Sequence, residues 1–313
     1  MLDVRNLKVE YLTRRGPVRA VEDVSFTLNA GEVVGLAGES GSGKSTIAHA
    51  LLRILPPPAL ITSGQVLFGE QDVLQMDMAE LEQFRWDSIS IVFQSAMNAL
   101  NPVMRIRDQL IDVMQVHGLS SAEANQRAVR LFDLVGIEPQ RLDAYPHQLS
   151  GGMRQRAVIA IALALDPPLL IMDEPTTALD VVVQKDILQQ IASLRDKLGF
   201  SILFITHDLS LLVEFATRIA IMYAGEIVER AFSRELFDKP LHPYTVGLMN
   251  SFPSISGAKR KLTGIPGAPP DLVAPPSGCR FHPRCPHAMP VCSQASPLTK
   301  MISTDHSVAC HLF

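Results

Sequence analysis

The stretch GESGSGKS, residues 38–45, follows the apolar run EVVGLA at 32–37 and precedes a segment with helical periodicity. It matches the pattern G-x-x-x-x-G-K-[ST] in the strand–loop–helix context that this pattern requires. The glycines let the backbone wrap a phosphate with inward N–H groups, and the following helix N-terminus favours negative charge. The pattern predicts a nucleotide site in which Lys44 bridges the β- and γ-phosphates and Ser45 binds Mg²⁺. The alternative, a glycine-rich turn before an ordinary helix, is disfavoured because the context is right on both sides.

Strands and helices alternate outward from this loop, which predicts an α/β fold with a largely parallel sheet covered by helices. Residues 2–37 read as strands, because apolar side chains alternate with polar ones before the buried run. Further strands are predicted at 169–172, 201–206 and 218–222, and helices at 44–55, over most of 95–165 and at 182–197.

A second motif, PLLIMDEP at 168–175, is an apolar strand that ends in two acids. The carboxyl ends of parallel strands share one edge of a sheet, so Asp173 and Glu174 are predicted to lie beside the phosphate loop. Asp173 would hold Mg²⁺ through water, and Glu174 would be the general base for the attacking water. A pair of solvated carboxylates at a strand end is the alternative.

The charge and the apolar content of the chain limit the kinds of partner that it can bind. The 28 basic and 32 acidic residues give a net charge of -4, without the basic excess typical of a nucleic-acid binder. The longest apolar run, residues 157–165, is nine residues long, whereas a membrane-spanning helix needs about 20. No signal sequence is evident at the N-terminus. We therefore expect a cytosolic chain that reaches a membrane through partner proteins, and no nucleic acid.

Several further motifs occur in the order typical of one ATPase family. They are LSGGMRQ at 149–155, Phe93-Gln94, Ala178-Leu179-Asp180 and Thr206-His207-Asp208. Residues 1–230 resemble the ABC transporter ATPase domain, in which these motifs are the signature, the Q-loop, the D-loop and the switch histidine. The resemblance implies a P-loop fold with a parallel sheet core, an antiparallel β subdomain and a helical subdomain at about 95–165.

The resemblance also implies a role for each residue. Gln94 would contact Mg²⁺ and the lytic water, His207 the γ-phosphate, and Tyr11 would stack on adenine. The signature residues Ser150, Gly151 and Gly152 would open a helix and bind the nucleotide of the opposite subunit. The remaining nucleotide-binding positions would be Gly38, Ser40, Gly41, Gly43, Thr46 and Asp180. Each assignment has a structural alternative when the resemblance is set aside. Residues 150–152 could be the start of an ordinary capped helix, and Gln94 could be a surface residue. His207 could be a capping residue, and Tyr11 could be a packing residue.

Three stretches after residue 230, the C-terminal tail, indicate a particular branch of this family. HPYT at 242–245, PGAPPDL at 266–272 and CRFHPRCP at 279–286 are similar to the C-terminal region of bacterial dipeptide and oligopeptide importer ATPases. One departure is Val182, where relatives commonly have a small polar residue. The resemblance implies a peripheral subunit on the cytoplasmic face of the inner membrane. Its partners would be a second, similar ATPase, two permease subunits and an extracytoplasmic binding protein. Nickel, glutathione and oligosaccharides are alternative cargoes.

Composition changes after residue 230, where prolines accumulate, helical periodicity disappears and all four cysteines follow. We expect a small irregular domain at 231–313, in which a metal centre would replace a missing apolar core. Cys279, Cys285, Cys292 and Cys310 are separated by five, six and seventeen residues, which does not fit a common zinc ribbon. A [4Fe–4S] cluster, zinc and free thiols remain open from spacing alone. The resemblance favours the cluster, with His282, His287, His306 and His311 as alternative ligands.

The sequence disfavours two rival functions. An ABC ATPase acting on ribosomes or DNA commonly has two ATPase halves or long coiled-coil insertions, and neither occurs here. A metal-sensing module with a vestigial ATPase is disfavoured because Lys44, Asp173, Glu174 and His207 are all present.

Overall fold

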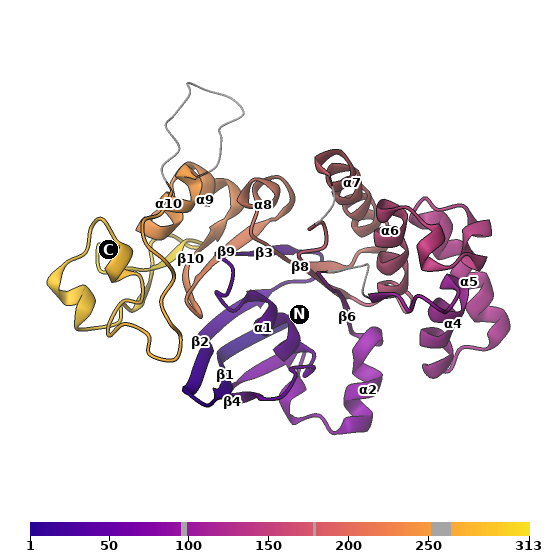
Figure 1. Cartoon of the computed structure of the whole chain (residues 1–313), viewed down its shortest axis with the longest axis horizontal. Coiled ribbons are helices and arrows are strands. Elements are labelled where there is room, and N and C mark those ends of the chain that lie inside the picture. The colour runs from indigo at the N-terminus through magenta and orange to yellow at the C-terminus, as the bar shows by residue number, and fades with distance from the viewer. Residues whose placement is uncertain (95–98, 178–179, 252–263) are drawn as a thin grey trace. The chain divides into compact units, whose positions relative to one another are not determined.

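The computed structural model of the chain describes residues 1–94, 99–177, 180–251 and 264–313 (Figure 1). The chain forms two compact units. Unit 1 combines Met1–Leu28, Val33–Leu74 and Ile205–Phe313, and unit 2 combines Asn29–Glu32 and Gln75–Phe204. The two ends of the chain therefore belong to the same unit.

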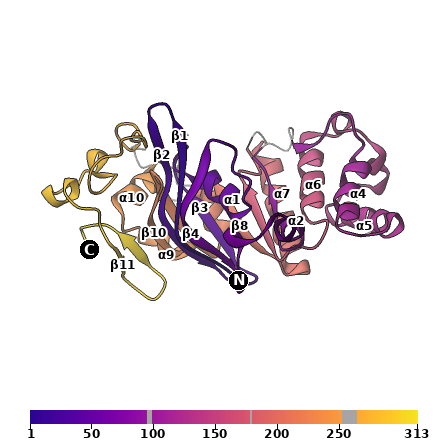
Figure 2. The same cartoon turned by 90° about the horizontal axis from the view of Figure 1, so that it is seen from below.

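An antiparallel sheet in the order β2-β1-β4-β5 forms one part of unit 1 (Figure 2). Its strands are β1 (Leu2–Thr13), β2 (Gly16–Leu28), β4 (Ala59–Phe68) and β5 (Gln71–Asp72). In β1, Leu7 and Val9 are fully buried, because alternate side chains of a strand point to one face. The predicted antiparallel β subdomain is confirmed.

A second set of strands in unit 1 has the order β11-β12-β10-β9-β3. Their bounds are β3 (Val33–Ala37), β9 (Arg218–Tyr223), β10 (Glu226–Phe232), β11 (Thr299–Met301) and β12 (Ser307–Ala309). Strands β3 and β9 are parallel, and the other pairs are antiparallel. Every residue of β3 and β9 is buried, which is typical of strands covered on both faces.

The helices of unit 1 are α1 (Lys44–Leu51), α8 (Leu209–Phe215), α9 (Ser233–Asp238) and α10 (Pro243–Asn250). Helix α1 was predicted to continue to residue 55 and to be ended by the prolines at 56–58. That prediction is wrong in its end point. The helix ends at Leu51, because Arg53 adopts a left-handed backbone conformation with φ of 51°.

Unit 2 contains β6 (Ile89–Val92), β7 (Leu169–Asp173) and most of β8 (Ser201–Thr206), in the order β8-β7-β6. Its helices are α2 (Met78–Asp87), α4 (Ile106–Val116), α5 (Ser121–Leu134), α6 (Gly151–Ala162) and α7 (Val181–Leu198). Helix α5 begins with a reciprocal capping box between Ser120 and Glu123, and α7 ends at Gly199 with φ of 78°. Helices α4–α6 occupy the region predicted to be helical.

The C-terminal tail is more ordered than predicted. Helices α9 and α10 follow residue 230, and β12 extends the sheet by pairing with β10. Figure 1 shows the yellow tail strands beside the orange β10. An aromatic cluster supplies apolar packing, with Phe281 at 5.1 Å from Tyr223 and 5.4 Å from Tyr244 between ring centroids. The aromatic cluster thus joins the tail to Tyr223 of β9, so the tail does not lack apolar packing.

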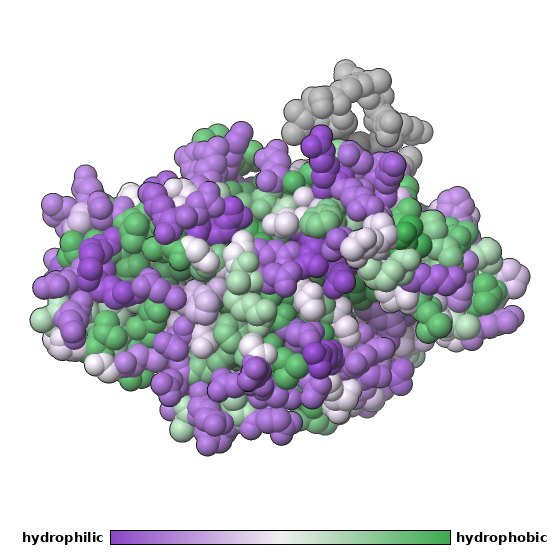
Figure 3. Space-filling view, turned by 180° about the vertical axis from the view of Figure 1, so that it is seen from behind, coloured by the Kyte–Doolittle hydropathy of each residue, from purple (hydrophilic) through white to green (hydrophobic). Residues whose placement is uncertain are grey.

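No helix in the described part of the chain is both long and apolar enough to cross a bilayer. Hydrophilic and hydrophobic residues are intermixed over the face seen in Figure 3.

Candidate functional site

The loop between β3 and α1 approaches neighbouring backbone very closely at two glycines. A Cβ atom on Gly38 would lie 2.2 Å from the carbonyl oxygen of Met222, and one on Gly43 would lie 2.1 Å from that of Ala20. Both glycines also have positive φ angles, 154° and 103°. No other residue type fits these positions, so the glycine spacing of the motif is explained by the fold.

Lys44 is buried at the start of α1, with 5% of its surface exposed. Its Nζ donates hydrogen bonds to the carbonyl oxygens of Gly38 at 2.9 Å and Glu39 at 3.0 Å. The lysine therefore lies against the backbone of the loop, at the position from which the motif's lysine reaches the β- and γ-phosphates. Ser40 and Gly41 are exposed at its tip, and Ser45 follows in the first helical turn.

Tyr11 comes from β1 but reaches the same loop–helix junction. Its hydroxyl lies 3.3 Å from Oγ1 of Thr46. The tyrosine is therefore beside the predicted phosphate site. His207 comes directly after β8, belongs to unit 1 and is exposed. The next residue, Asp208, caps α8 by accepting from the N–H groups of Ser210 and Leu211.

The carboxylate of Glu174 is held by two side chains in unit 2. Strands β6 and β7 are parallel, with Val92 paired to Met172, so the residues after each strand meet. Gln94 Nε2 donates to Glu174 Oε2 at 3.0 Å, and Thr177 Oγ1 donates to the same oxygen at 3.0 Å.

Two consecutive acids end β7 with different surroundings. Asp173 is buried with 3% exposure, and Glu174 has a left-handed φ of 46°, which is rare for a residue with a side chain. Strain of this kind is typical of functional sites.

The signature stretch forms the start of α6. Ser150 is the N-cap and accepts from the N–H of Met153 at 3.2 Å, and Gly151 and Gly152 are the first two helical residues. A Cβ on Gly152 would lie 3.1 Å from Val183 of α7. Asp180 caps α7 by accepting from the N–H groups of Val182 and Val183. The two helix starts are thus adjacent within unit 2.

The predicted site residues are divided between the two units. Tyr11, residues 38–46 and His207 belong to unit 1, and Gln94, 150–152, Asp173, Glu174 and Asp180 belong to unit 2. Ala178 and Leu179 of the predicted D-loop lie outside the described residues.

All four cysteines line one small pocket in the tail. Burial raises the pKa of Cys279 to about 11 and raises the pKa values of Cys285 and Cys310 as well. Backbone N–H groups lower these pKa values in part, by donating to the sulfur two residues earlier, as Phe281 does for Cys279. Among the residues that the structure describes, no group of three or more His, Cys, Asp or Glu side chains is placed to hold a metal ion.

The sequence reasoning missed two residues at the phosphate loop. Tyr244 and Arg284, both from the tail, contact Glu39. Each lies in a stretch that resembles the family's C-terminal region, but neither stretch indicated a contact with the loop.

Two family models match the chain. The family model described as ABC transporter matches residues 21–177, and the one described as oligopeptide/dipeptide transporter, C-terminal region, matches residues 228–292.

Two relatives extend over nearly the whole chain. A dipeptide transport ATP-binding protein, DppD, from Caldanaerobacter subterraneus is 42% identical over 100% of this chain and 97% of its own length. An oligopeptide transport ATP-binding protein, OppD, from Salmonella typhimurium is 44% identical over 95% of this chain and 90% of its own length.

Solved structures show the same fold over three quarters of the chain. A dimeric bacterial ABC transporter cassette has a TM-score of 0.67 and 29% identity, covering 75% of this chain and 99% of its own. The same cassette has been solved in a post-hydrolysis state with ADP and phosphate. CbiO1 from Clostridium perfringens has a TM-score of 0.67 and 26% identity, covering 76% of this chain and 90% of its own. The chain therefore belongs to the ABC transporter family, in the group of ATP-binding proteins of dipeptide and oligopeptide transport.

Proposed function

We propose that this ABC-type ATPase couples ATP hydrolysis to the import of dipeptides or oligopeptides, as a peripheral subunit on the cytoplasmic face of the membrane. The observation that carries the proposal is the match of both the ATPase region and the tail to peptide-transport relatives over nearly their full lengths. Nickel, glutathione or oligosaccharide cargo is the alternative. Substrate-stimulated ATPase activity of the complete transporter distinguishes them, and stimulation by a non-peptide cargo alone would refute peptide import.

Nucleotide binding is assigned to the loop of unit 1. Lys44 would bind the β- and γ-phosphates, the backbone from Gly38 to Thr46 would surround them, and Tyr11 would stack on the adenine. Support comes from the buried lysine, the two close glycine approaches and the Tyr11–Thr46 contact. Ser45, Gln94 and Asp173 offer the oxygen ligands that Mg²⁺ prefers, and the ion would neutralise phosphate charge.

Hydrolysis is assigned to Glu174 as general base. A water attacks the γ-phosphorus, its proton passes to the carboxylate, and the bond to the ADP oxygen breaks. The hydrogen bonds from Gln94 and Thr177 to Oε2 fix the orientation of this carboxylate. His207 would contact the γ-phosphate.

The first prediction is that Glu174→Gln retains ATP binding but loses turnover. Removal of a general base costs roughly 100-fold or more in rate, while the phosphate contacts of Lys44 remain. Nucleotide binding and steady-state ATPase activity of the assembled transporter are the measurements. Glu70→Gln, in an exposed turn, is the matched control. Wild-type turnover in Glu174→Gln would contradict the assignment.

The signature residues imply a partner. Ser150, Gly151 and Gly152 form the start of α6, and the N-terminus of a helix is suited to an anion. We propose that they bind the nucleotide of a second, similar ATPase, with Asp180 at the same interface. Two permease subunits and an extracytoplasmic binding protein would complete the transporter.

We also propose that Cys279, Cys285, Cys292 and Cys310 hold one structural [4Fe–4S] cluster, with zinc as the alternative metal. The donor set suits it, because four thiols line one pocket and backbone N–H groups point at the sulfurs. Such a cluster takes one thiolate at each iron, so its ligands do not converge on one ion. Iron and sulfide analysis after anaerobic purification tests it.

A further inference from the structure

Glu39, inside the phosphate loop, is held by two residues from the far end of the chain. Arg284 makes a bidentate contact with the Glu39 carboxylate. Its Nη1 donates to Oε2 at 2.7 Å, and its Nη2 donates to Oε1 at 3.0 Å. The N–H of Glu39 donates to the Tyr244 hydroxyl at 2.9 Å. Arg284 and Glu39 are 245 residues apart in sequence, and both lie in unit 1. Side chain and backbone of one loop residue are therefore both fixed by the tail.

Glu39 in turn fixes the lysine of the loop. Its carbonyl oxygen accepts from Lys44 Nζ at 3.0 Å and from the N–H of Ser42 at 3.2 Å. A displacement of Glu39 would move an acceptor of Lys44 and the turn that precedes it. The chain of contacts thus runs from Arg284 through Glu39 to the ammonium group.

The side chains that hold Glu39 have little freedom to move, because they are largely buried and have further partners. The Arg284 side chain is 6% exposed and that of Glu39 is 26% exposed. Arg284 also donates to the carbonyl of Pro266 at 2.8 Å and to the hydroxyl of Tyr223 at 3.3 Å. Tyr223 packs on Tyr244, with 4.6 Å between their ring centroids. A planar guanidinium with this many fixed partners has little freedom to follow a moving loop.

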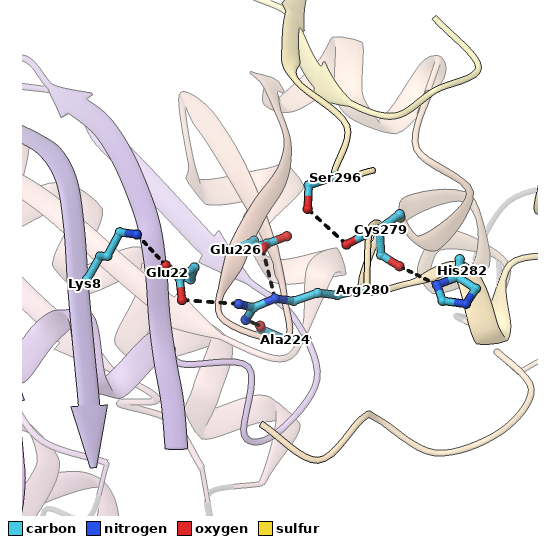
Figure 4. A network of polar contacts seen from close by, with 9 residues as sticks. Lys8, Glu22, Ala224, Glu226, Cys279, Arg280, His282 and Ser296 are labelled. Atoms are coloured by element: carbon cyan, nitrogen blue, oxygen red, sulfur yellow. Dashed lines mark hydrogen bonds and ion pairs between the residues drawn. The ribbon is translucent and has the colours of Figure 1, made fainter. Parts of the chain in front are cut away.

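A second arginine of the same tail segment is connected to the loop through the turn between β9 and β10. Arg280 donates to the carbonyl of Ala224 and pairs with Glu226 at 2.9 Å (Figure 4). The next residue of that turn, Gly225, donates its N–H to the carbonyl of Ser42 at 3.0 Å. Arg280 follows Cys279 directly and Arg284 precedes Cys285 directly, so both arginines lie within the cysteine loop, residues 279–285.

We propose that Arg284 is a positioning residue for the phosphate loop, so that the conformation of the cysteine-containing segment 279–285 sets the affinity of the loop for nucleotide phosphates. The proposal rests on the assignment of Lys44 to the β- and γ-phosphates. Order in the tail is then a condition for tight ATP binding, even though the tail contributes no group to the phosphates.

Nucleotide binding by the full-length chain tests the proposal. With fluorescent ATP, ADP and AMP analogues, Arg284→Gln is expected to weaken ATP and ADP roughly tenfold, the loss expected for a paired charge-assisted contact. AMP binding stays unchanged, because Lys44 acts beyond the α-phosphate. Arg284→Lys, which can form one contact but not two, recovers part of the loss.

The matched control is Arg15→Gln. Arg15 also joins the tail to the rest of unit 1, through Asp271, but at the exposed β1–β2 turn. We expect wild-type nucleotide affinity. An equal loss in Arg15→Gln would overturn the proposal, because any weakened tail contact would then suffice.

A double variant separates positioning from charge. If Arg284→Gln acts by leaving the Glu39 carboxylate unpaired near phosphates, then Glu39→Gln in the same chain restores binding and the proposal is wrong. If Arg284 positions Glu39, the double variant and both single variants show the same loss. Tyr244→Phe, which removes only the acceptor for the Glu39 N–H, serves if Arg284→Gln does not fold.

Lys44→Ala distinguishes failure of the proposed phosphate site from failure of the positioning role of Arg284. Normal ATP binding by Lys44→Ala would refute the phosphate site itself. Loss of binding in Lys44→Ala together with wild-type affinity in Arg284→Gln would refute the positioning role alone.

Discussion

At the scale of single residues, the phosphate loop depends on the space around Gly43 as well as on its backbone angle. Gly43→Ala would place a Cβ 2.1 Å from the Ala20 carbonyl oxygen, a backbone atom that cannot turn aside. We expect loss of ATP binding together with a lower unfolding temperature. Isothermal titration with ATP and thermal unfolding are the measurements.

Gly199→Ala is the matched control for this residue. Gly199 ends α7 with φ of 78°, and an added Cβ would meet no atom within 4 Å. Only the left-handed conformation is penalised, at about 1–2 kcal/mol of unfolding free energy. Nucleotide affinity should therefore be unchanged. If both variants bind ATP normally, the close approach at Gly43 does not exist in solution.

At the scale of elements, the cysteine loop is expected to depend on the proposed metal even though it shares the aromatic core. Cys285→Ser should abolish the cluster, loosen residues from about 265 onward and weaken ATP binding through Arg284. Ala288→Ser introduces the same side chain at an exposed, non-ligating position of the loop and is the control. Iron and sulfide content, with hydrogen exchange of the tail, are the measurements. Stoichiometric zinc without iron, or an unchanged tail in Cys285→Ser, would contradict the expectation.

The pH dependence of the proposed metal site follows from the buried thiols. Burial raises the pKa of Cys279 to about 11, so the thiol is protonated at neutral pH and would have to lose its proton to bind iron. Metal affinity therefore rises with pH, and acidification favours release.

The helices and strands also show how far the sequence could predict the structure. Strands β3, β7, β8 and β9 were predicted to within a residue, because each is a short apolar run bounded by turns. Helix α10 was missed, because only part of its surface is buried and its eight residues show no clear period. The contact between Arg284 and Glu39 has no signature in the sequence, since tertiary folding alone brings together residues so far apart.

At the scale of the whole molecule, the proposed roles imply that the catalytic residues and the signature helix serve different nucleotides. An isolated chain should therefore hydrolyse ATP poorly, and its activity should rise steeply when the partner ATPase and permease subunits are added. ATPase rates over a range of protein concentration, alone and in the assembled transporter, measure this. A full hydrolysis rate from a proven monomer, independent of concentration, would contradict the shared site.

Unit 1 is built from both ends of the chain, and this orders its folding in time. A ribosome that adds about 5–20 residues per second needs roughly 10–50 s to proceed from Glu39 to Arg284. Throughout that interval the phosphate loop exists without the arginine that holds it. Strand β10 is likewise made before its neighbour β12. The nucleotide site can reach its final form only after Arg284 has left the exit tunnel. A message truncated before the codon for Arg284 would therefore yield an ATPase unit that remains unfinished, although every residue of its phosphate loop has been made.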